Sequence, residues 1–152
     1  MEDLDTADEF LGTYMHAMDA KGRLVLPAPH RQLLEEGRLV MTLGFDNCLV
    51  IHPMQDWQEV SSSLRSMQRG DQHQRRIARA IFSNASKQEL DKQGRVSIPP
   101  NLRDAVQLTN AVAVIGMGTH IELWSAEEWE AESGISRDAY TNTKGGLGIG
   151  SF

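Results

Sequence analysis

The fold of this chain is decided by a ten-residue stretch that occurs twice. The first copy reads Met18-Asp19-Ala20-Lys21-Gly22-Arg23-Leu24-Val25-Leu26-Pro27, and the second reads Leu90-Asp91-Lys92-Gln93-Gly94-Arg95-Val96-Ser97-Ile98-Pro99. Both follow the pattern apolar-Asp-x-x-Gly-Arg-apolar-x-apolar-Pro, at an offset of 72 positions. The same offset, kept without a gap, places Phe10 on Phe82, Arg31 on Arg103 and Trp57 on Trp129. One register kept from residue 10 to residue 57 indicates a duplicated unit.

Each copy of the stretch predicts a hairpin. Glycine adopts the positive φ of a tight turn, and aspartate accepts hydrogen bonds from the amides that follow it. Each unit is therefore expected to contain strand, turn, strand, short helix, strand, turn, strand and helix, which makes an α+β protein. The expected strands are 10–18, 24–26, 39–43 and 48–52 in the first unit, and 86–90, 96–98, 111–115 and 120–124 in the second. Helices are expected at 28–36 and from residues 53, 99 and 125.

Five segments follow from the pattern along the chain. Residues 1–9 form an acidic arm that lacks the apolar residues needed for order, and residues 133–152 form a disordered tail, because the pattern ends at Gly134. The two units occupy 10–57 and 83–132. Residues 58–82 form a basic helical connector, with a break near Arg69-Gly70-Asp71.

Composition restricts the class of protein. A chain of 152 residues suits two small units that share a core. Its only cysteine, Cys48, lies in an apolar run and is expected in the core, in a reducing compartment. No apolar run is long enough to cross a membrane, so we expect a soluble cytoplasmic protein with no membrane partner. The net charge of −6 comes from the chain ends, because residues 10–125 carry 13 bases and 11 acids.

The repeated hairpin is the best candidate site. Its cations are Lys21 and Arg23 in the first copy, and Lys92 and Arg95 in the second. Two such loops on a duplicated scaffold can meet successive phosphates or one groove of double-stranded DNA, and an arginine fork matches phosphate or guanine. Asp19 and Asp91 are assigned to the loop amides, or to an ion pair that aims an arginine, while Gly22 and Gly94 make the turn. The alternative is that the pattern is only a stable turn, although turn chemistry does not require the arginine after each glycine.

Other arginines have simpler interpretations. Arg75, Arg76 and Arg79 give the connector a basic face, which favours a solvated surface or ion pairs over DNA contact. Arg31 and Arg103 are expected to pair with acids beside the core.

The sequence does not favour an enzyme. Its histidines are scattered without metal-ligand spacing, no glycine-rich phosphate loop precedes a helix, and no nucleophile has a base nearby in the sequence. We therefore expect no catalytic residue, metal, cofactor or small-molecule substrate.

Several motifs together resemble the MraZ family of bacterial regulators, which are built from two SpoVT-AbrB-type motifs. The motifs are Phe10-Leu11-Gly12-Thr13-Tyr14, the two Asp-x-x-Gly-Arg loops, Pro53-x-x-x-Trp57, Arg75-Arg76 before Ile81-Phe82, and Ile121-Glu122-Leu123-Trp124. The resemblance covers about residues 10–132. It implies interlocked units of the swapped-hairpin β-barrel type, related by a pseudo-two-fold axis, with DNA-contacting loops at Asp19–Arg23 and Asp91–Arg95. It also implies a nucleoid-associated ring oligomer that binds tandem promoter repeats and mostly represses the division and cell-wall gene cluster.

Assembly also has a physical basis. A unit of about 45 residues buries little surface by itself, and a ring would let many weak loop contacts act together. This reconciles an acidic chain with DNA binding. The competing hypothesis is an oligomeric protein-interaction module, antitoxin-like and without specific DNA binding, in which the tail is the functional part.

Overall fold

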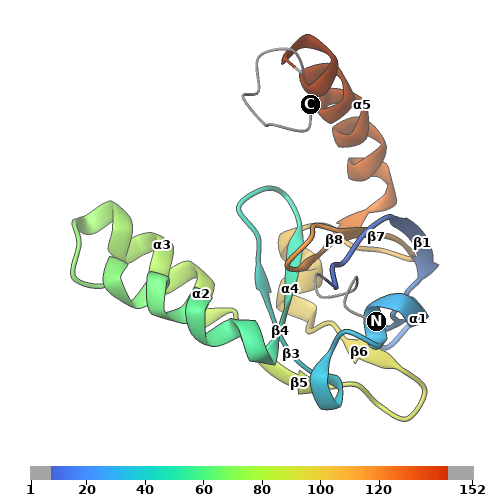
Figure 1. Ribbon diagram of the computed structural model, residues 1–152, viewed down its shortest axis with the longest axis horizontal. Helices are drawn as coiled ribbons and strands as arrows, with labels where there is room; N and C mark the ends of the chain where they lie inside the picture. The colour runs from blue at the N-terminus through green and yellow to red at the C-terminus, as the bar shows by residue number, and fades with distance from the viewer. Residues whose placement is uncertain (1–7, 144–152) are drawn as a thin grey trace, which may run out of the picture.

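The computed structural model describes residues 8–143 as a mixed α+β protein (Figure 1). The first unit contains β1 (Thr13–Ala17), β2 (Arg23–Val25), α1 (Ala28–Arg31), the 3-10 helix η2 (Glu35–Gly37), β3 (Arg38–Leu43), β4 (Leu49–Pro53) and α2 (Met54–Met67). Then follow α3 (Gln72–Ser83), β5 (Ser86–Glu89), β6 (Arg95–Ser97), α4 (Pro100–Ala105), β7 (Ala111–Gly116), β8 (Ile121–Ser125) and α5 (Ala126–Thr143). The predicted order of strands and helices is therefore present in both units.

The two units exchange strands. Six strands form one antiparallel sheet in the order β1-β7-β8-β4-β3-β5, and β2 pairs with β6 in a separate ribbon. The first strand of each unit thus pairs with the third strand of the other unit. Leu24 lies opposite Val96, and Val50 lies opposite Glu122. Since both pairs are separated by the repeat offset, a pseudo-two-fold axis passes through each pairing.

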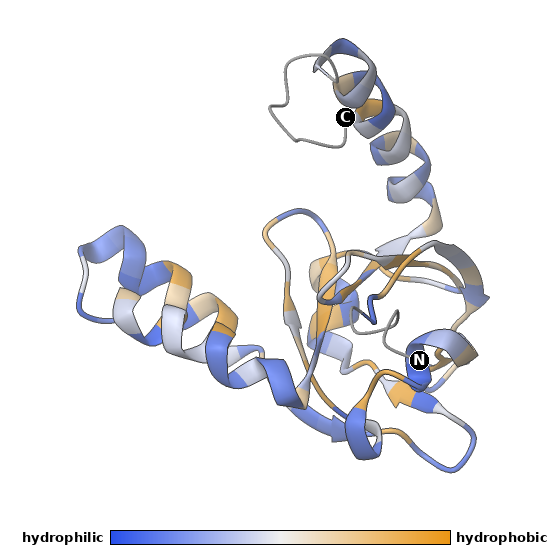
Figure 2. Cartoon of the chain, viewed as in Figure 1, coloured by the Kyte–Doolittle hydropathy of each residue, from blue (hydrophilic) through white to orange (hydrophobic). Residues whose placement is uncertain are grey.

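Apolar side chains from both units form the core. The largest cluster includes Leu24, Ile51, Val96 and Leu123, each at most 1% exposed. Figure 2 shows hydrophobic segments concentrated in the β-body, while α2 and α3 are largely hydrophilic. Cys48 is fully buried in a second cluster, as predicted, and burial raises the pKa of its thiol to about 12. A thiol in that state is a packing group and not a nucleophile.

Three local predictions differ from the structure. The helix expected at 28–36 is shorter, because Leu34 turns to extended backbone and Glu36 takes a φ of 55°. The strand expected at 10–18 is regular only over β1, since Gly12 has a φ of 90° and only a single bridge joins Phe10 to Gly118. Disorder from residue 133 is wrong as far as Thr143, because α5 continues there. One glycine weakens a helix without ending it, and no proline follows. Residues 1–7 of the expected arm and 144–152 of the expected tail lie outside the described residues.

The connector is a pair of helices that projects from the body (Figure 1). α2 and α3 meet at a break between Gln68 and Asp71, where the sequence predicted one. Asp71 begins α3 with a capping box, in which its carboxylate accepts from the Gln74 amide at 2.8 Å and the Gln74 side chain accepts from the Asp71 amide. Among the described helices, none has the length and hydrophobicity to span a bilayer.

Candidate nucleic-acid interface

The first loop is organised by the carboxylate of Asp19. Its Oδ1 accepts hydrogen bonds from the amides of Lys21 and Arg23, both at 2.9 Å. Its Oδ2 accepts from Nε of Arg23 at 2.8 Å. Gly22 closes the turn with a φ of 81° and donates to the Asp19 carbonyl. One carboxylate therefore shapes the backbone and also orients the guanidinium.

The second loop repeats this geometry. Oδ1 of Asp91 accepts from the amides of Gln93 and Arg95 at 2.9 Å, and Oδ2 accepts from Nε of Arg95 at 2.7 Å. Gly94 has a φ of 76°. These hydrogen bonds and ion pairs lower the pKa of Asp19 and of Asp91, with the backbone hydrogen bond from each loop's arginine as the largest cause. Both proposed roles of the aspartates, amide acceptor and ion-pair partner, are confirmed.

The two loops form one surface. Their second strands, β2 and β6, pair directly, with Val25 opposite Arg95 and Arg23 opposite Ser97. Nη1 of Arg95 lies 4.0 Å from Oδ2 of Asp19, so the guanidinium of one unit reaches the carboxylate of the other. The loops that are far apart in sequence are thus side by side in the folded protein.

Arg31 and Arg103 support the loops from the opposite unit, which corrects the expectation that they pair with acids. Arg31 donates from Nη1 to the Leu26 carbonyl, and a Cβ added at Gly94 would lie 2.6 Å from its Cδ. A Cβ added at Gly22 would lie 2.8 Å from Cζ of Arg103. Within residues 8–143 neither arginine forms an ion pair. The sequence offset that aligns these two arginines was the available signal, but it did not show that each would pack under the other unit's glycine.

Both loop arginines stay within reach of solvent. The side chain of Arg23 is 35% exposed and that of Arg95 is 23% exposed, while Lys21 and Lys92 are exposed. Within the described part of the chain, the Nη atoms of Arg23 make no hydrogen bond, so they can donate to an incoming acceptor. Because Nε is already held, the outer face of the fork is oriented before any ligand arrives. Phosphate oxygens and the guanine major-groove edge are the acceptors that such a fork matches.

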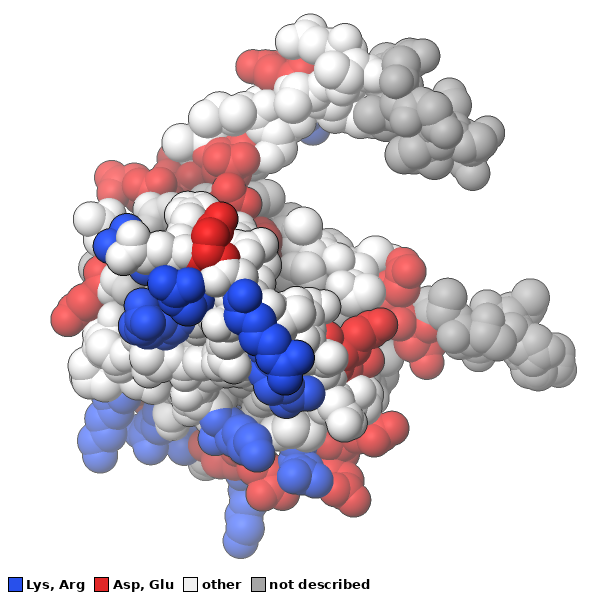
Figure 3. Space-filling model, turned by 90° about the vertical axis from the view of Figure 1, so that its left-hand side faces the viewer, with Lys and Arg blue, Asp and Glu red and all other residues white. Residues whose placement is uncertain are grey.

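A second basic surface lies on the connector. Arg65, Arg69, Arg75, Arg76 and Arg79 are all exposed on α2, α3 and the turn between them. Figure 3 faces this side of the molecule and shows Lys and Arg side chains gathered on its nearest part. Arg75 donates to the Gly70 carbonyl at 2.8 Å and Arg65 to Ser61 Oγ at 3.2 Å, so two of the five are tied to their own helix pair. Among residues 8–143, no cluster of metal-ligating side chains is present.

The fold and the site together define a class of protein: a duplicated α+β chain whose units exchange strands and present two Asp–Arg loops side by side. The family model described as "MraZ protein, putative antitoxin-like" matches this chain twice, over residues 10–80 and 81–140. The chain therefore belongs to the MraZ family.

Relatives named "Transcriptional regulator MraZ" cover most of the chain. The one from Herpetosiphon aurantiacus is 46% identical over 121 residues, which is 80% of this chain and 84% of the relative. The one from Halothermothrix orenii is 40% identical over 131 residues, or 86% of this chain and 91% of the relative. The one from Acetivibrio thermocellus is 38% identical over 143 residues, or 92% of this chain and 99% of the relative. The similarity thus spans both units.

Proposed function

We propose that this chain is a sequence-specific DNA-binding transcription regulator. The observation that carries the proposal is the pairing of the two loops, in which two guanidinium groups are held by aspartates on one surface. Asp19, Lys21, Gly22 and Arg23 would form one half of the DNA contact, and Asp91, Lys92, Gly94 and Arg95 the other half. The relatives named as transcriptional regulators support the same assignment.

The proposed mode of binding rests on the family resemblance and on electrostatics. We propose a ring of identical chains with a swapped-hairpin barrel in each, which binds tandem promoter repeats and represses the division and cell-wall gene cluster from the nucleoid. A net charge of −6 repels DNA, so affinity must come from local loop contacts multiplied by assembly. Several weak contacts on one scaffold bind tightly through effective concentration.

The test is binding of the double variant Arg23→Ala, Arg95→Ala to a duplex that contains the promoter repeats. We expect wild-type binding to weaken steeply with salt, because cationic contacts to phosphate release counterions. The double variant should lose at least about tenfold in affinity while keeping its oligomeric mass. A matched control is Arg38→Ala, which removes an exposed arginine from β3, outside the two loops. Unchanged affinity in the double variant would reject the loop assignment.

A protein-interaction module is the second candidate, and α5 is the observation that favours it. This helix of 18 residues has no buried residue, and Ile135 is 62% exposed on it. Such a helix offers a surface through which an antitoxin-like module binds a protein partner. Pull-down with the full chain and with a chain ending at residue 133 separates the candidates. A stoichiometric protein partner that needs residues 134–152, with no DNA retained by either form, would favour the interaction module.

A further inference from the structure

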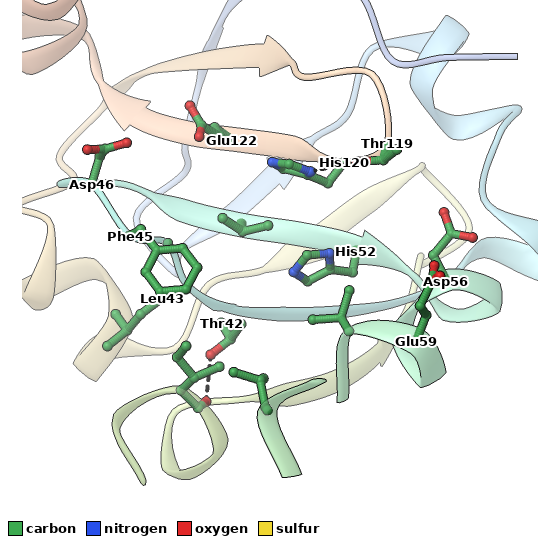
Figure 4. Close-up of a pocket in the computed structure, with 15 residues that line it drawn as sticks. Thr42, Leu43, Phe45, Asp46, His52, Asp56, Glu59, Thr119, His120 and Glu122 are labelled. Carbon is green, nitrogen blue, oxygen red and sulfur yellow. Dashed lines mark hydrogen bonds between the residues drawn. The ribbon is translucent and has the colours of Figure 1, made fainter. Parts of the chain in front are cut away.

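A cavity of about 500 Å³ lies away from the two loops, between the helix pair α2–α3 and the face of the sheet formed by β3, β4 and β8 (Figure 4). We call it the acidic pocket, because its lining includes the carboxyl side chains of Asp46, Asp56, Glu59 and Glu122, and no lysine or arginine lines it. The floor is apolar, and the ring of Phe45, which is 81% exposed, lies at one end. This size and mixture of walls is typical of a ligand site.

Two histidines occupy the centre of the acidic pocket. His52 and His120 lie side by side there, with ring centroids 5.5 Å apart (Figure 4). Burial, with a smaller contribution from His120, lowers the pKa of His52 to about 4, so this imidazole carries no charge at pH 7. Neutral imidazole adds no charge to offset the surrounding carboxylates.

The lining of the acidic pocket favours a ligand that has a cationic end group on an apolar chain. Carboxylates at both ends attract positive charge, the apolar floor accepts methylene groups, and an aromatic ring at the rim favours a guanidinium through cation–π contact. An arginine side chain combines these features. Lysine fits less well, because it lacks the planar fork that binds carboxylates in a bidentate way.

The chain itself carries such arginines at a distance from its own pocket. Arg69 is exposed at the turn between α2 and α3, and Arg76 is exposed on α3. Within residues 8–143 neither side chain forms a hydrogen bond or an ion pair. Asp56 and Glu59 lie near the start of α2, whereas the turn lies beyond its end. A helix rises 1.5 Å per residue, so about 20 Å separates Asp56 from Arg69. Arg69 therefore cannot reach the pocket of its own chain, and Arg76 is not among the residues that line that pocket.

We propose that the acidic pocket binds Arg69 and Arg76 of the α2–α3 helix pair from a second copy of the chain. The projection of the helix pair from the body leaves the turn accessible to a neighbour (Figures 1 and 3). Pocket and turn are different surfaces, so the contact is heterologous, and repetition of it gives a closed ring or an open filament. The inference rests on the proposed oligomer and identifies the residues that hold it together.

Charge reversal tests the contact without DNA. One variant carries Asp56→Arg and Glu59→Arg, and the other carries Arg69→Glu and Arg76→Glu. All four side chains are exposed, so both variants should fold, and their thermal unfolding checks this. By native mass spectrometry, we expect each variant alone to have the mass of one chain. An equimolar mixture should regain the wild-type mass, because each reversed pocket then meets a turn of opposite charge.

A cross-link gives a second measurement. Mixing Glu59→Cys with Arg76→Cys under mild oxidation should yield a disulfide-linked dimer, whereas either variant alone should yield little. A monomeric wild type, a reversed variant that keeps the wild-type mass, or a mixture that stays monomeric would each overturn the proposal. The double variant Arg23→Ala, Arg95→Ala should keep the wild-type mass, so failure of this contact is distinguishable from failure of the DNA assignment.

Discussion

Arg95 of the second loop reaches Asp19 of the first, with Nη1 at 4.0 Å from Oδ2. Asp19 therefore faces two guanidinium groups, its own Arg23 at 2.8 Å and the neighbouring Arg95. No equivalent contact from Arg23 to Asp91 lies within ion-pair distance. The two loops have equivalent internal hydrogen bonds but differ in this contact between loops. Of the two loop arginines, Arg95 is the less exposed. The pseudo-symmetric site is thus not fully symmetric in its charges.

This asymmetry predicts unequal effects of removing each carboxylate charge. Asp19→Asn releases two arginines, whereas Asp91→Asn releases one. We expect Asp19→Asn to lower the ratio of specific to non-specific DNA affinity by about tenfold, and Asp91→Asn to lower it less. Non-specific affinity should hold or rise, since one negative charge is removed from the proposed DNA-binding surface. Competition binding with repeat and scrambled duplexes measures both, with Asp138→Asn on α5 as a charge control. Equal ratios for the two loop variants would contradict the asymmetry.

The glycines of the two turns predict a loss of stability on substitution. Gly22→Ala and Gly94→Ala each place a Cβ at positive φ and within 3 Å of an arginine side chain from the other unit. We expect each to destabilise the fold by about 1–2 kcal/mol. Gly134→Ala is the matched control, and its expected change in stability has the opposite sign. Gly134 lies in α5 with nothing near its Cβ position, so alanine there should stabilise that helix by up to about 1 kcal/mol. Urea unfolding curves measure all three changes. Loop variants as stable as the wild type would exclude close packing of the arginine side chains against the two glycines.

The local parts of the site were predictable from the sequence. Asp19 and Asp91 accept hydrogen bonds inside their own loops, as the sequence predicted. The spacing allows this, because each aspartate lies three positions before the turn glycine and four before the arginine. The contact between Asp19 and Arg95 depends instead on pairing of β2 with β6, whose partners are 70 to 74 positions apart. No local propensity specifies that pairing.

Arg31 and the end of α5 show two further limits. Arg31 was expected beside an acid, but it donates to a backbone carbonyl and packs against a glycine of the other unit. Neither partner carries a charge, so no pattern in the sequence indicated the contact. α5 continues through Gly134 because a helix can pass a glycine at a cost of about 1 kcal/mol. The loss of an apolar pattern marks where a helix leaves the core, and not where it ends.

Replacement of Arg31 and of Arg103, which pack under the loops, should change the free energy of unfolding by different amounts. Nε of Arg103 is buried without a hydrogen-bond partner, whereas Arg31 donates to the Leu26 carbonyl. Arg31→Met loses that hydrogen bond, so it should cost about 1 kcal/mol more stability than Arg103→Met, which removes an unsatisfied donor. Urea unfolding at pH 7 compares the two variants. A larger loss for Arg103→Met would contradict this assignment.

Histidine burial predicts that stability falls in mild acid. The pKa of His52 is about 4 in the folded chain against an ordinary value of 6.5, so the unfolded chain binds more protons between these values. Stability from this group is fully present above pH 6.5, and it is lost as the pH falls toward 4. Burial also lowers the pKa of His30, which adds to the same trend. Asp19 and Asp91 have lowered pKa values, so their contribution is lost only at still lower pH.

Substitution of His52 should therefore flatten the pH dependence of unfolding. We expect His52→Gln to remove on the order of 2 kcal/mol of the stability change between pH 6.5 and pH 4. His73→Gln, which replaces an exposed histidine on α3, serves as the control and should leave the curve close to wild type. Urea midpoints at half-unit pH steps measure both variants. Because His52 lies at the centre of the acidic pocket, an unchanged slope in His52→Gln would mean that this imidazole is as accessible to protons in the folded chain as in the unfolded one.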